Sequence, residues 1–532
     1  MLDQCRKALL VYPRFSGSSF WNYRETCEVI GAKHPAPPLG LITVAALLPA
    51  SWDLRLVDRN IDDLSAADVA WADVILTGGM LPQQADTLAI VELAHGQAKP
   101  VVVGGPDVTS SPDRYASADF RVLGEAEGVI DDFVLAYLAG HPNGLFESPK
   151  FQVDVTRSPI PRFDLLNFNH YVQIGVQFSR GCPFTCEFCD IIELYGRKPR
   201  AKTTAQMLAE LERLYQLGYR GHVDFVDDNL IGNKKAVKNV LPALREWQER
   251  KGFPFEFSTE ASLNLADDTE LLGMMKAAAF FAVFIGIETP DTATLMATGK
   301  KQNTRGPIAD SIARIYQAGL FVLAGFIVGF DDEHGDISEP MIRLIEEAAI
   351  PVCMVGLLYA LPNTQLTRRL QQEGRLFRGH DVDAPSEGSA DQCTSGLNFV
   401  TRRPRKEVLS DYRRVIAAVY RPDRYFGRVE RMARALKLDG PSGSLHLATL
   451  GKDLRQFARL LWHVPGHLPG ARRYFWVTLF RCVFANPRSI KPVLKALALY
   501  VHLGVFAQVV EREITRQIST VGDPSNSDLV MI

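Results

Sequence analysis

The stretch FSRGCPFTCEFCDII, residues 178–192, is the part of the sequence that decides the fold, because three cysteines follow a short apolar segment. Cys182, Cys186 and Cys189 form a C-x3-C-x2-C pattern. Three thiolates on one loop suit a [4Fe–4S] cluster and leave its fourth iron open to bind and reduce a ligand. A zinc site is the other interpretation, but such sites usually have four ligands, and no Cys or His follows at that spacing. The spacing therefore favours the cluster.

Apolar segments on both sides of this loop predict a barrel. Six βα units are expected, and their strands are residues 173–179, 222–228, 255–263, 280–288, 321–330 and 351–360. The segments between them carry apolar residues at helical spacing, and most of them close on glycine. This order predicts a complete or partial parallel (β/α)6 barrel over residues 173–365, with its chemistry at the carboxyl ends of the strands.

The N-terminal part predicts a second α/β domain, at residues 1–145, with a doubly wound, Rossmann-like sheet. Its expected strands are residues 7–13, 53–58, 72–79, 100–105 and 120–123, and several of them end in glycine. Ligands of such sheets bind outside the carboxyl ends of the strands, where glycine lets the backbone approach closely. The first strand is not followed by G-x-G-x-x-G, so a nicotinamide dinucleotide is not favoured. Residues 146–172, which contain several prolines, are expected to be a linker.

The C-terminal part, residues 366–532, is expected to be a mainly helical, basic domain. Residues 401–532 carry 23 Lys and Arg against 10 Asp and Glu, whereas residues 1–400 carry 36 against 51. This asymmetry suggests contact with an anionic partner, or neutralisation by the acidic remainder of the chain. Aromatic residues alternate with the basic ones, as in helices that lie on a membrane surface, although packing against the barrel would bury the same residues. The same alternation disfavours nucleic acid.

Cellular location is indicated by the cysteines and the apolar runs. Eight cysteines spread over 532 residues fit a reduced, cytosolic protein, and the N-terminus shows no signal-peptide pattern. The apolar run from Ala496 to Val510 has only 15 residues, fewer than the roughly 20 that a membrane-spanning helix needs. We therefore expect a cytoplasmic protein without a transmembrane helix, whose C-terminal domain is the part that would meet the inner face of the membrane.

The cysteine pattern, with Phe188 before the last cysteine, resembles the radical S-adenosylmethionine (SAM) superfamily. The α/β domain ahead of it is similar to the cobalamin-binding domain of the cobalamin-dependent class, so the resemblance covers residues 1–365. The stretches FCDIIELYGRKPR, LNFVTRRPR and YRPDRYFGRV resemble the branch that contains the hopanoid C-2 methylases. The resemblance implies a [4Fe–4S] cluster, SAM and cobalamin as cofactors. It also implies an electron donor such as flavodoxin or ferredoxin, and a small-molecule or lipid substrate.

The resemblance also implies residues that bind SAM. Phe188 would lie against the adenine, and GFIVGF, with Gly325 and Gly329, resembles the glycine motif on the adenine side. Strand-end residues would contact the amino group or the ribose: Asp227, Asp228, Asn229, Glu260 and Glu288. The first three form VDDN, in the place of the motif for the methionine amino group, which suits carboxylates. The common motif is Gly-Gly-Glu, so which of the three makes the contact stays open. For each acid the alternative is a salt bridge to a barrel helix, and no residue is assigned a catalytic role.

Cobalamin contacts are implied for glycine-containing loops of the first domain, at Thr77, Gly78, Gly79, Gly104, Gly105, Gly124 and Glu125. Two purely structural glycine turns would produce the same pattern. The D-x-H-x-x-G motif is missing, because His34 and His95 lack the required neighbours. The resemblance therefore implies base-off cobalamin without a histidine ligand, and both histidines are expected to be ordinary surface residues.

These expectations define a cobalamin-dependent radical SAM methyltransferase that acts on an unactivated carbon, with a lipid such as a hopanoid as the implied substrate. In such enzymes a 5′-deoxyadenosyl radical removes hydrogen from the substrate, which then takes a methyl group from methylcobalamin. One alternative keeps the cofactors but leads to ring formation, ring contraction or oxidation without net methyl transfer. Another is a non-catalytic sensor of cobalamin or of redox state.

Overall fold

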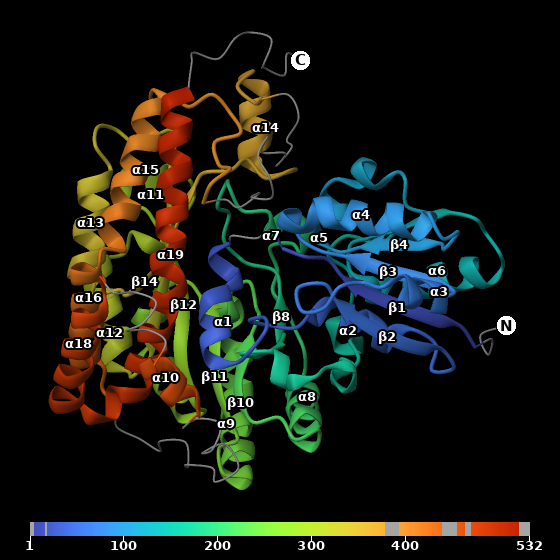
Figure 1. Ribbon diagram of the computed structural model, residues 1–532, viewed down its shortest axis with the longest axis horizontal. Helices are drawn as coiled ribbons and strands as arrows, with labels where there is room; N and C mark the ends of the chain where they lie inside the picture. The colour runs from blue at the N-terminus through green and yellow to red at the C-terminus, as the bar shows by residue number, and fades with distance from the viewer. Residues whose placement is uncertain (1–4, 16–18, 378–392, 439–454, 463–469, 521–532) are drawn as a thin grey trace. The chain divides into compact units, whose positions relative to one another are not determined.

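The computed structural model describes residues 5–15, 19–377, 393–438, 455–462 and 470–520 (Figure 1). Contacts divide the chain into two compact units. The first unit comprises residues 1–17, 33–183 and 190–219, and the second comprises residues 18–32, 184–189 and 220–532. These units differ from the four segments expected from the sequence, whose boundaries stay a prediction.

The first unit contains a parallel six-stranded sheet with the strand order β2-β1-β3-β4-β5-β6. Its strands are β1 (Lys7–Tyr12), β2 (Asp53–Asp58), β3 (Val74–Gly78), β4 (Val101–Gly104), β5 (Phe120–Leu123) and β6 (Gly144–Glu147). The first five confirm the expected strands, but β6 is one that the sequence analysis missed. Its four residues alternate between half-buried and exposed, so the segment lacks the continuous apolar character of a central strand.

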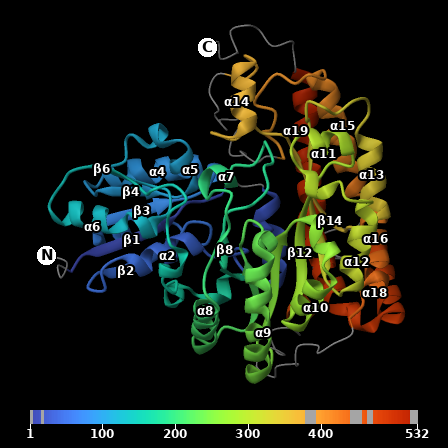
Figure 2. The ribbon, with the colours of Figure 1, turned by 180° about the vertical axis from the view of Figure 1, so that it is seen from behind.

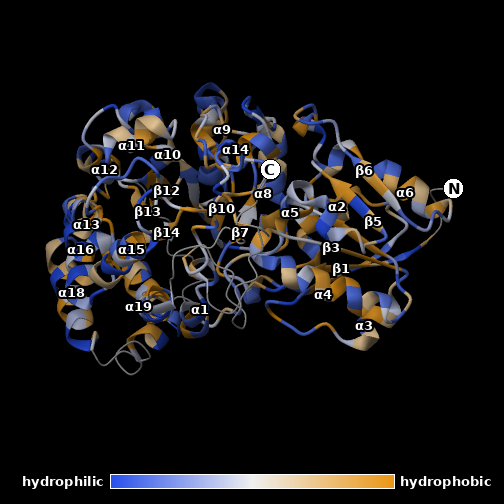
Figure 3. Cartoon of the chain, turned by 90° about the horizontal axis from the view of Figure 1, so that it is seen from above, coloured by the Kyte–Doolittle hydropathy of each residue, from blue (hydrophilic) through white to orange (hydrophobic). Residues whose placement is uncertain are grey.

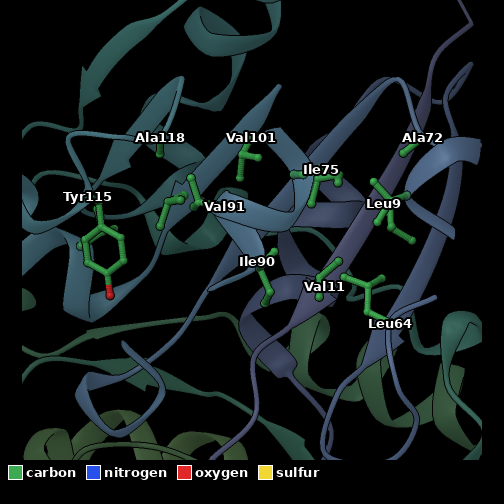
Figure 4. Close-up of a cluster of buried hydrophobic side chains, with 14 of the residues drawn as sticks. Leu9, Val11, Leu64, Ala72, Ile75, Ile90, Val91, Val101, Tyr115 and Ala118 are labelled. Carbon is green, nitrogen blue, oxygen red and sulfur yellow. The ribbon is translucent and has the colours of Figure 1, made fainter. Parts of the chain in front are cut away.

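Helices cover both faces of this sheet, as expected for a doubly wound fold. They are α2 (Leu39–Leu47), α3 (Ala66–Trp71), α4 (Gln84–His95), α5 (Pro106–Ser110) and α6 (Ile130–Leu138). Leu9 and Val11 of β1 pack with Ile75 and Ile90 on one face (Figure 4), whereas Ala8 packs on the other face with Phe120. This alternation follows the two-residue period of a strand. The strand order reverses between β1 and β3, which places a ligand site at their carboxyl ends.

The second unit contains the parallel strands β10 (Gly221–Phe225), β11 (Phe255–Ala261), β12 (Phe280–Glu288), β13 (Phe321–Val328) and β14 (Val352–Leu357). Each pairs with the next in parallel, from β10 to β14, with register shifts in the β11–β12 and β12–β13 pairs. Together with β7 (Ile174–Val176) of the first unit, all six strands expected for the barrel are present. The predicted α/β fold with a partial parallel (β/α)6 barrel is confirmed.

Helices follow the strands of the second unit in the expected places: α9 (Lys234–Lys251), α10 (Thr269–Ala277), α11 (Thr292–Ala297), α12 (Ile308–Gln317) and α13 (Ser338–Glu347). Helix α9 illustrates why the sequence forms them. The Asn233 side chain caps its first turn, and Gly252 ends it in the left-handed conformation. Between these ends Val237, Leu241 and Leu244 recur at helical spacing and are buried.

The C-terminal part of the second unit is helical, as predicted. It contains α14 (Gln365–Gln372), α15 (Arg405–Val419), α16 (Pro422–Ala435), α18 (Arg472–Ala485) and α19 (Ile490–Thr520), and α1 (Arg24–Ile30) packs with them. Figures 1 and 2 both show α16, α18 and α19 side by side. Figure 3 shows polar and apolar residues mixed along these helices.

Helix α19 differs from the expectation for the apolar run that it contains. The helix has 31 residues, and the span Pro487–Thr520 is long and apolar enough to cross a membrane. However, 67% of its most apolar window is buried inside the protein. Its contacts with α15, α1, α18 and α16 make it the central helix of this region. The prediction that this apolar segment is too short to cross a membrane was therefore wrong about the length of the helix.

Candidate active site

The loop Phe184–Cys189 belongs to the second unit and is held by two segments of that unit. The backbone N–H of Glu187 donates to the carbonyl of Thr298 at 3.0 Å, and that of Leu366 donates to the carbonyl of Glu187 at 2.8 Å. Gly299 has a φ of +78°, and a Cβ atom there would lie 2.6 Å from the carbonyl oxygen of Thr185. Glycine is therefore required where residues 298–303 pass the loop.

The side chain of Glu187 fixes the loop to α14. Arg369 donates to both carboxylate oxygens of Glu187, from Nη2 at 3.0 Å and from Nε at 3.2 Å. Arg369 also donates to Asp331 at 2.7 Å, and Arg375 pairs with the same aspartate at 2.5 Å. Bidentate guanidinium–carboxylate pairs fix orientation as well as distance. The residue between Cys186 and Phe188 is thus oriented by the C-terminal region.

Two residues near Cys186 were missed by the sequence analysis. Gln302 is buried, and its Nε2 donates to the Sγ of Cys186 at 3.8 Å. The Lys300 Nζ lies 6.0 Å from the Phe188 ring centroid and pairs with Glu288 at 2.5 Å. Burial opposes the charge of Lys300, but the charges of Glu288, Cys186 and Cys189 outweigh burial and hold its pKa above the usual value. A largely buried cation therefore lies beside the thiols.

Cys182 belongs to the first unit, so the three cysteines are divided between the units. Its backbone N–H donates to the Gly196 carbonyl at 3.2 Å, and Gly181 before it has a φ of +97°. Within the described ranges, no three Cys, His, Asp or Glu side chains are grouped as metal ligands. The cluster assignment of Cys182, Cys186 and Cys189 therefore stays a prediction. The residues around Cys186 fit such a cluster, because the cation of Lys300 and the amide of Gln302 suit anionic thiolates.

Three of the predicted acids lie close together: Asp227 and Asp228 follow β10, and Glu260 is near the end of β11. Glu260 is accessible to solvent, but desolvation by the protein around it, together with the charges of Asp224, Asp228 and Asp227, raises its pKa to about 8. Asn229 is instead engaged by Ser262, in hydrogen bonds of 3.2 Å each way. The acids suit an ammonium group, whereas Asn229 fixes the loop that carries two of them.

Glu288 ends β12 in an unusual backbone conformation. Its φ is +72°, and the pairing of β12 with β13 shifts register between Gly286 and Glu288. A Cβ atom on Gly286 would lie 2.5 Å from the Glu288 carboxylate and 3.0 Å from the Lys300 Nζ. A left-handed glutamate is strained and is common at functional sites. Glu288 therefore forms a salt bridge, as the alternative interpretation expected, but its partner Lys300 lies in a loop and not on a barrel helix.

Of the two predicted glycines, Gly325 lies within β13 against an aromatic ring, and Gly329 follows the strand against aliphatic side chains. A Cβ atom on Gly325 would be 3.2 Å from the ring of Phe284. Phe330, which follows Gly329, has its ring centroid 5.6 Å from that of Phe188. The structure therefore places the ring of Phe188 next to that of Phe330, the residue after Gly329.

Glu333 holds the turn after Gly329, where φ is +111°. Its Oε2 accepts a hydrogen bond from the Gly329 N–H at 2.9 Å, and its Oε1 has no hydrogen-bond partner among the described residues. Burial raises the pKa of Glu333 to about 8, so the carboxyl is protonated at neutral pH. The turn depends on a neutral acid, a feature that no local sequence pattern signals.

Replacing Glu333 by alanine is expected to destabilise the protein by about 1–3 kcal/mol, because the Gly329 N–H loses its partner. Glu333→Gln should cost less, since an amide oxygen still accepts the bond. Because the folded-state pKa is raised, the contribution of Glu333 is present at low pH and is lost as pH rises toward 8. Denaturation curves between pH 5 and pH 9 should show this loss in the wild type and not in the glutamine variant. Equal curves would contradict the prediction.

A polar row on β10 and β11 was also missed. The Nε2 of His222 lies 2.6 Å from the Oγ of Ser258, which donates to Asp224. Burial, and then the charge of Lys495, lower the pKa of His222 to about 3, whereas burial raises the pKa of Asp224. The row thus runs from the neutral imidazole of His222 through the hydroxyl of Ser258 to the carboxyl group of Asp224. It offers hydrogen bonds next to Glu260.

In the first unit, the predicted cobalamin loops after β3 and β4 touch each other. A Cβ atom on Gly78 would be 1.9 Å from the carbonyl of Gly104, and one on Gly105 would be 3.4 Å from the backbone of Gly79. Packing alone is enough to require these glycines, as the alternative of two purely structural turns states. The hydroxyl of buried Thr77 has no hydrogen-bond partner within the described residues. That orphaned donor at the reversal of strand order fits a polar ligand.

Glu125 is buried and fully engaged in ion pairs. It binds Arg180 at 2.9 Å and Arg200 at 2.7 Å, and Glu127 binds Arg180 at 2.6 Å. Gly124 has a φ of +80°, and its N–H donates to Thr109 at 2.9 Å. A small pocket opens here, lined among others by Thr109, Gly124, Glu125 and Ser148. The main contact of Glu125 is therefore with the arginines on either side of the Cys182 segment.

The two histidines of the first unit differ. His34 is buried, stacks on Phe15 with ring centroids 5.9 Å apart, and has its pKa lowered by burial to about 4. The expectation of a surface residue is wrong for His34, because aromatic packing takes it into the core. His95 is partly exposed and pairs with Asp119 at 2.9 Å, as expected for a surface residue.

Three regions of the chain match known protein families. Residues 28–134 match the B12 binding domain, residues 176–345 match the radical SAM superfamily, and residues 364–516 match a domain of unknown function, DUF4070. An uncharacterized methyltransferase of Synechocystis sp. is 43% identical, over 96% of this chain and 94% of that protein. The hopanoid C-2 methylase of Rhodopseudomonas palustris is 34% identical, over 95% and 94%.

Solved structures share the fold. The cobalamin-dependent SAM radical enzyme OxsB, with aqua-cobalamin and SAM bound, has a TM-score of 0.59 at 14% identity and covers 99% of this chain and 83% of its own. The radical SAM methyltransferase TsrM from Kitasatospora setae, with cobalamin and a [4Fe–4S] cluster bound, has a TM-score of 0.54 at 15% identity, over 70% and 78%.

Fold and relatives together define a cobalamin-dependent radical SAM enzyme. The chain belongs to the B12-binding radical SAM family, and it is a radical SAM methyltransferase. Its cofactors are a [4Fe–4S] cluster, SAM and cobalamin. The sequence interpretation is confirmed at this level.

Proposed function

We propose that the enzyme methylates an unactivated carbon of a lipid such as a hopanoid. The observation that carries this proposal is the 34% identity with a hopanoid C-2 methylase over 95% of the chain. That similarity includes the helical C-terminal region, which lies outside the B12 and radical SAM matches. We also keep the four predicted segments, 1–145, 146–172, 173–365 and 366–532, as proposed domains.

The second unit supports an apolar substrate. Along β12 and β13, partly accessible side chains interrupt the buried ones, and they include Phe284, Leu323 and Ile327. Exposed Trp21 lies against Phe284, with ring centroids 5.4 Å apart, and Val226 after β10 is also exposed. Accessible aromatic and aliphatic side chains along these strands suit hydrocarbon and exclude water from it.

When bound, the cluster, SAM and cobalamin would supply the electron, the hydrogen-abstracting radical and the methyl group. The chain supplies the positioning. Cys182, Cys186 and Cys189 would hold the cluster, and Lys300 and Gln302 provide a cation and an N–H beside it. Asp227, Asp228 and Glu260 would accept the ammonium group of SAM, while Glu288 would reach its ribose. The loops at Thr77, Gly104 and Gly124 would hold cobalamin.

The proposal is tested by incubating the anaerobically reconstituted enzyme with a strong reductant, hopanoid lipids and SAM that carries a deuterated methyl group. A labelled methyl group on the lipid, with equal amounts of 5′-deoxyadenosine and S-adenosylhomocysteine, is expected. Deoxyadenosine without S-adenosylhomocysteine would contradict it and indicate cyclisation, ring contraction or oxidation. Lipids of cells with and without the protein provide the unbiased comparison. A flavodoxin or ferredoxin as electron donor and a cytoplasmic location are part of the proposal.

Binding of SAM is expected to release a proton near pH 7, because Glu260 is protonated there and a nearby cation would ionise it. Isothermal titration calorimetry in buffers of different ionisation enthalpy measures this release. Glu260→Gln should bind without it, while Glu270→Gln, an exposed acid of α10, should behave as the wild type. An identical proton balance in all three proteins would contradict the prediction.

A further inference from the structure

Helix α18 is anchored by one side and exposes aromatic rings on the other. Phe475, Leu479 and Cys482 are buried in the second unit. On the opposite side Phe480 is 56% exposed and Phe484 is 85% exposed. Trp476 stacks on Phe480, with ring centroids 6.1 Å apart. The rings are therefore part of a well-packed helix and not of a loose segment.

The exposed residues form one stripe. Arg473, Val477, Phe480 and Phe484 are three or four positions apart, so they share a face of this 14-residue helix, which is about 21 Å long. Among the described residues, fifteen large apolar side chains are exposed, and six of them lie between Phe457 and Phe484. Such a concentration is unusual for a water-facing surface and marks an interaction site.

The charge along the stripe has one sign. Helix α18 carries Arg472, Arg473 and Arg481 and no acidic residue; Lys491, which follows it, pairs with Glu256 at 2.6 Å. Arg481 pairs with Glu430 at 3.3 Å, whereas Arg472 and Arg473 are exposed. The partner must therefore accept aromatic side chains and also offer negative charge next to them.

We propose that α18 lies in the surface of an anionic phospholipid bilayer, with Phe480 and Phe484 among the acyl chains and the arginines at the phosphates. An interfacial helix combines these two features: buried aromatic rings and basic residues at headgroup level. Nucleic acid would pair with the arginines but leave the phenylalanines in water. Helix α19 is not the membrane element, because most of its apolar surface is buried. The inference does not depend on which substrate is methylated.

The test is flotation of the full-length holoenzyme with vesicles of phosphatidylcholine, with and without phosphatidylglycerol. We expect binding to the anionic vesicles, weaker binding to the neutral ones, and release at high salt. The double substitution Phe480→Ser, Phe484→Ser should weaken binding about tenfold or more. Arg472→Gln with Arg473→Gln should reduce the preference for anionic lipid.

Leu135→Ser is the matched control, because Leu135 is 51% exposed on α6 in the first unit, and it should bind as the wild type. Unchanged iron content and circular dichroism establish that each variant is folded. Wild-type binding by the double phenylalanine variant would overturn the proposal. So would a wild type that floats with neither vesicle, or one that forms dimers through Phe480 and Phe484 in place of binding lipid.

Discussion

Cys186→Ala is expected to remove the iron–sulfur cluster and with it all reductive cleavage of SAM. Two remaining thiolates hold a four-iron cluster poorly, and without it no electron reaches the sulfonium. After anaerobic reconstitution, the iron and sulfide content should fall to a small fraction of that of the wild type. The electron paramagnetic resonance signal of the reduced cluster and the formation of 5′-deoxyadenosine should disappear. Cys182→Ala and Cys189→Ala should behave in the same way.

Cys353→Ala is the matched control. Cys353 is fully buried in β14, and burial raises its pKa to about 12, so it behaves as a small apolar side chain. Its replacement should cost at most about 2 kcal/mol of stability and leave the cluster intact. If the triple variant of Cys182, Cys186 and Cys189 keeps iron–sulfur absorption and cleaves SAM, the ligand assignment is wrong. Stoichiometric zinc in the native protein would also contradict the assignment of these cysteines to an iron–sulfur cluster.

Lys300→Met is expected to lower the reduction potential of the cluster. Lys300 is a largely buried cation whose charge interacts with Cys186 and Cys189, and a positive charge favours the more negative, reduced cluster. One charge several ångströms away, at an effective dielectric constant of about 20, shifts a potential by on the order of 100 mV. Redox titration followed by electron paramagnetic resonance measures this shift without turnover.

Two further variants separate charge from structure. Lys300→Met leaves Glu288 buried without its partner, so the double variant Lys300→Met, Glu288→Gln removes both charges and restores neutrality. Lys300→Arg keeps the charge and should keep a potential close to that of the wild type. If the methionine and arginine variants titrate alike, Lys300 acts only through packing and the electrostatic explanation fails.

The strands were predictable because each is a short, nearly continuous apolar segment, and β10 to β14 all lie where the sequence placed them. The surroundings of the cysteines were not. Gln302 reaches Cys186 across 116 residues, and the segment GKKQNTR has the composition of an ordinary polar loop. Such a contact depends on how the barrel closes, so no local period or motif encodes it. The acid–lysine pair at Glu288 was hidden in the same way.

Helix α19 shows the opposite limit. The sequence analysis counted only its apolar run of 15 residues, whereas the helix has 31. It continues through EREITRQIST because one side of these turns still packs, as buried Ile514 shows. Polar residues on the outer side of a packed helix do not end it. Helix length was thus set by tertiary contacts that a hydropathy count does not see.

The clamp from Arg369 to Glu187 limits how this enzyme can be re-engineered. A shortened version that stops after β14 would keep Cys182, Cys186 and Cys189 but lose the guanidinium that orients Glu187, which lies between two of them. Exchange of the C-terminal helices between relatives, for instance to change substrate, would break the same pair unless both partners travel together. The barrel and its C-terminal helices have to be transplanted as one module.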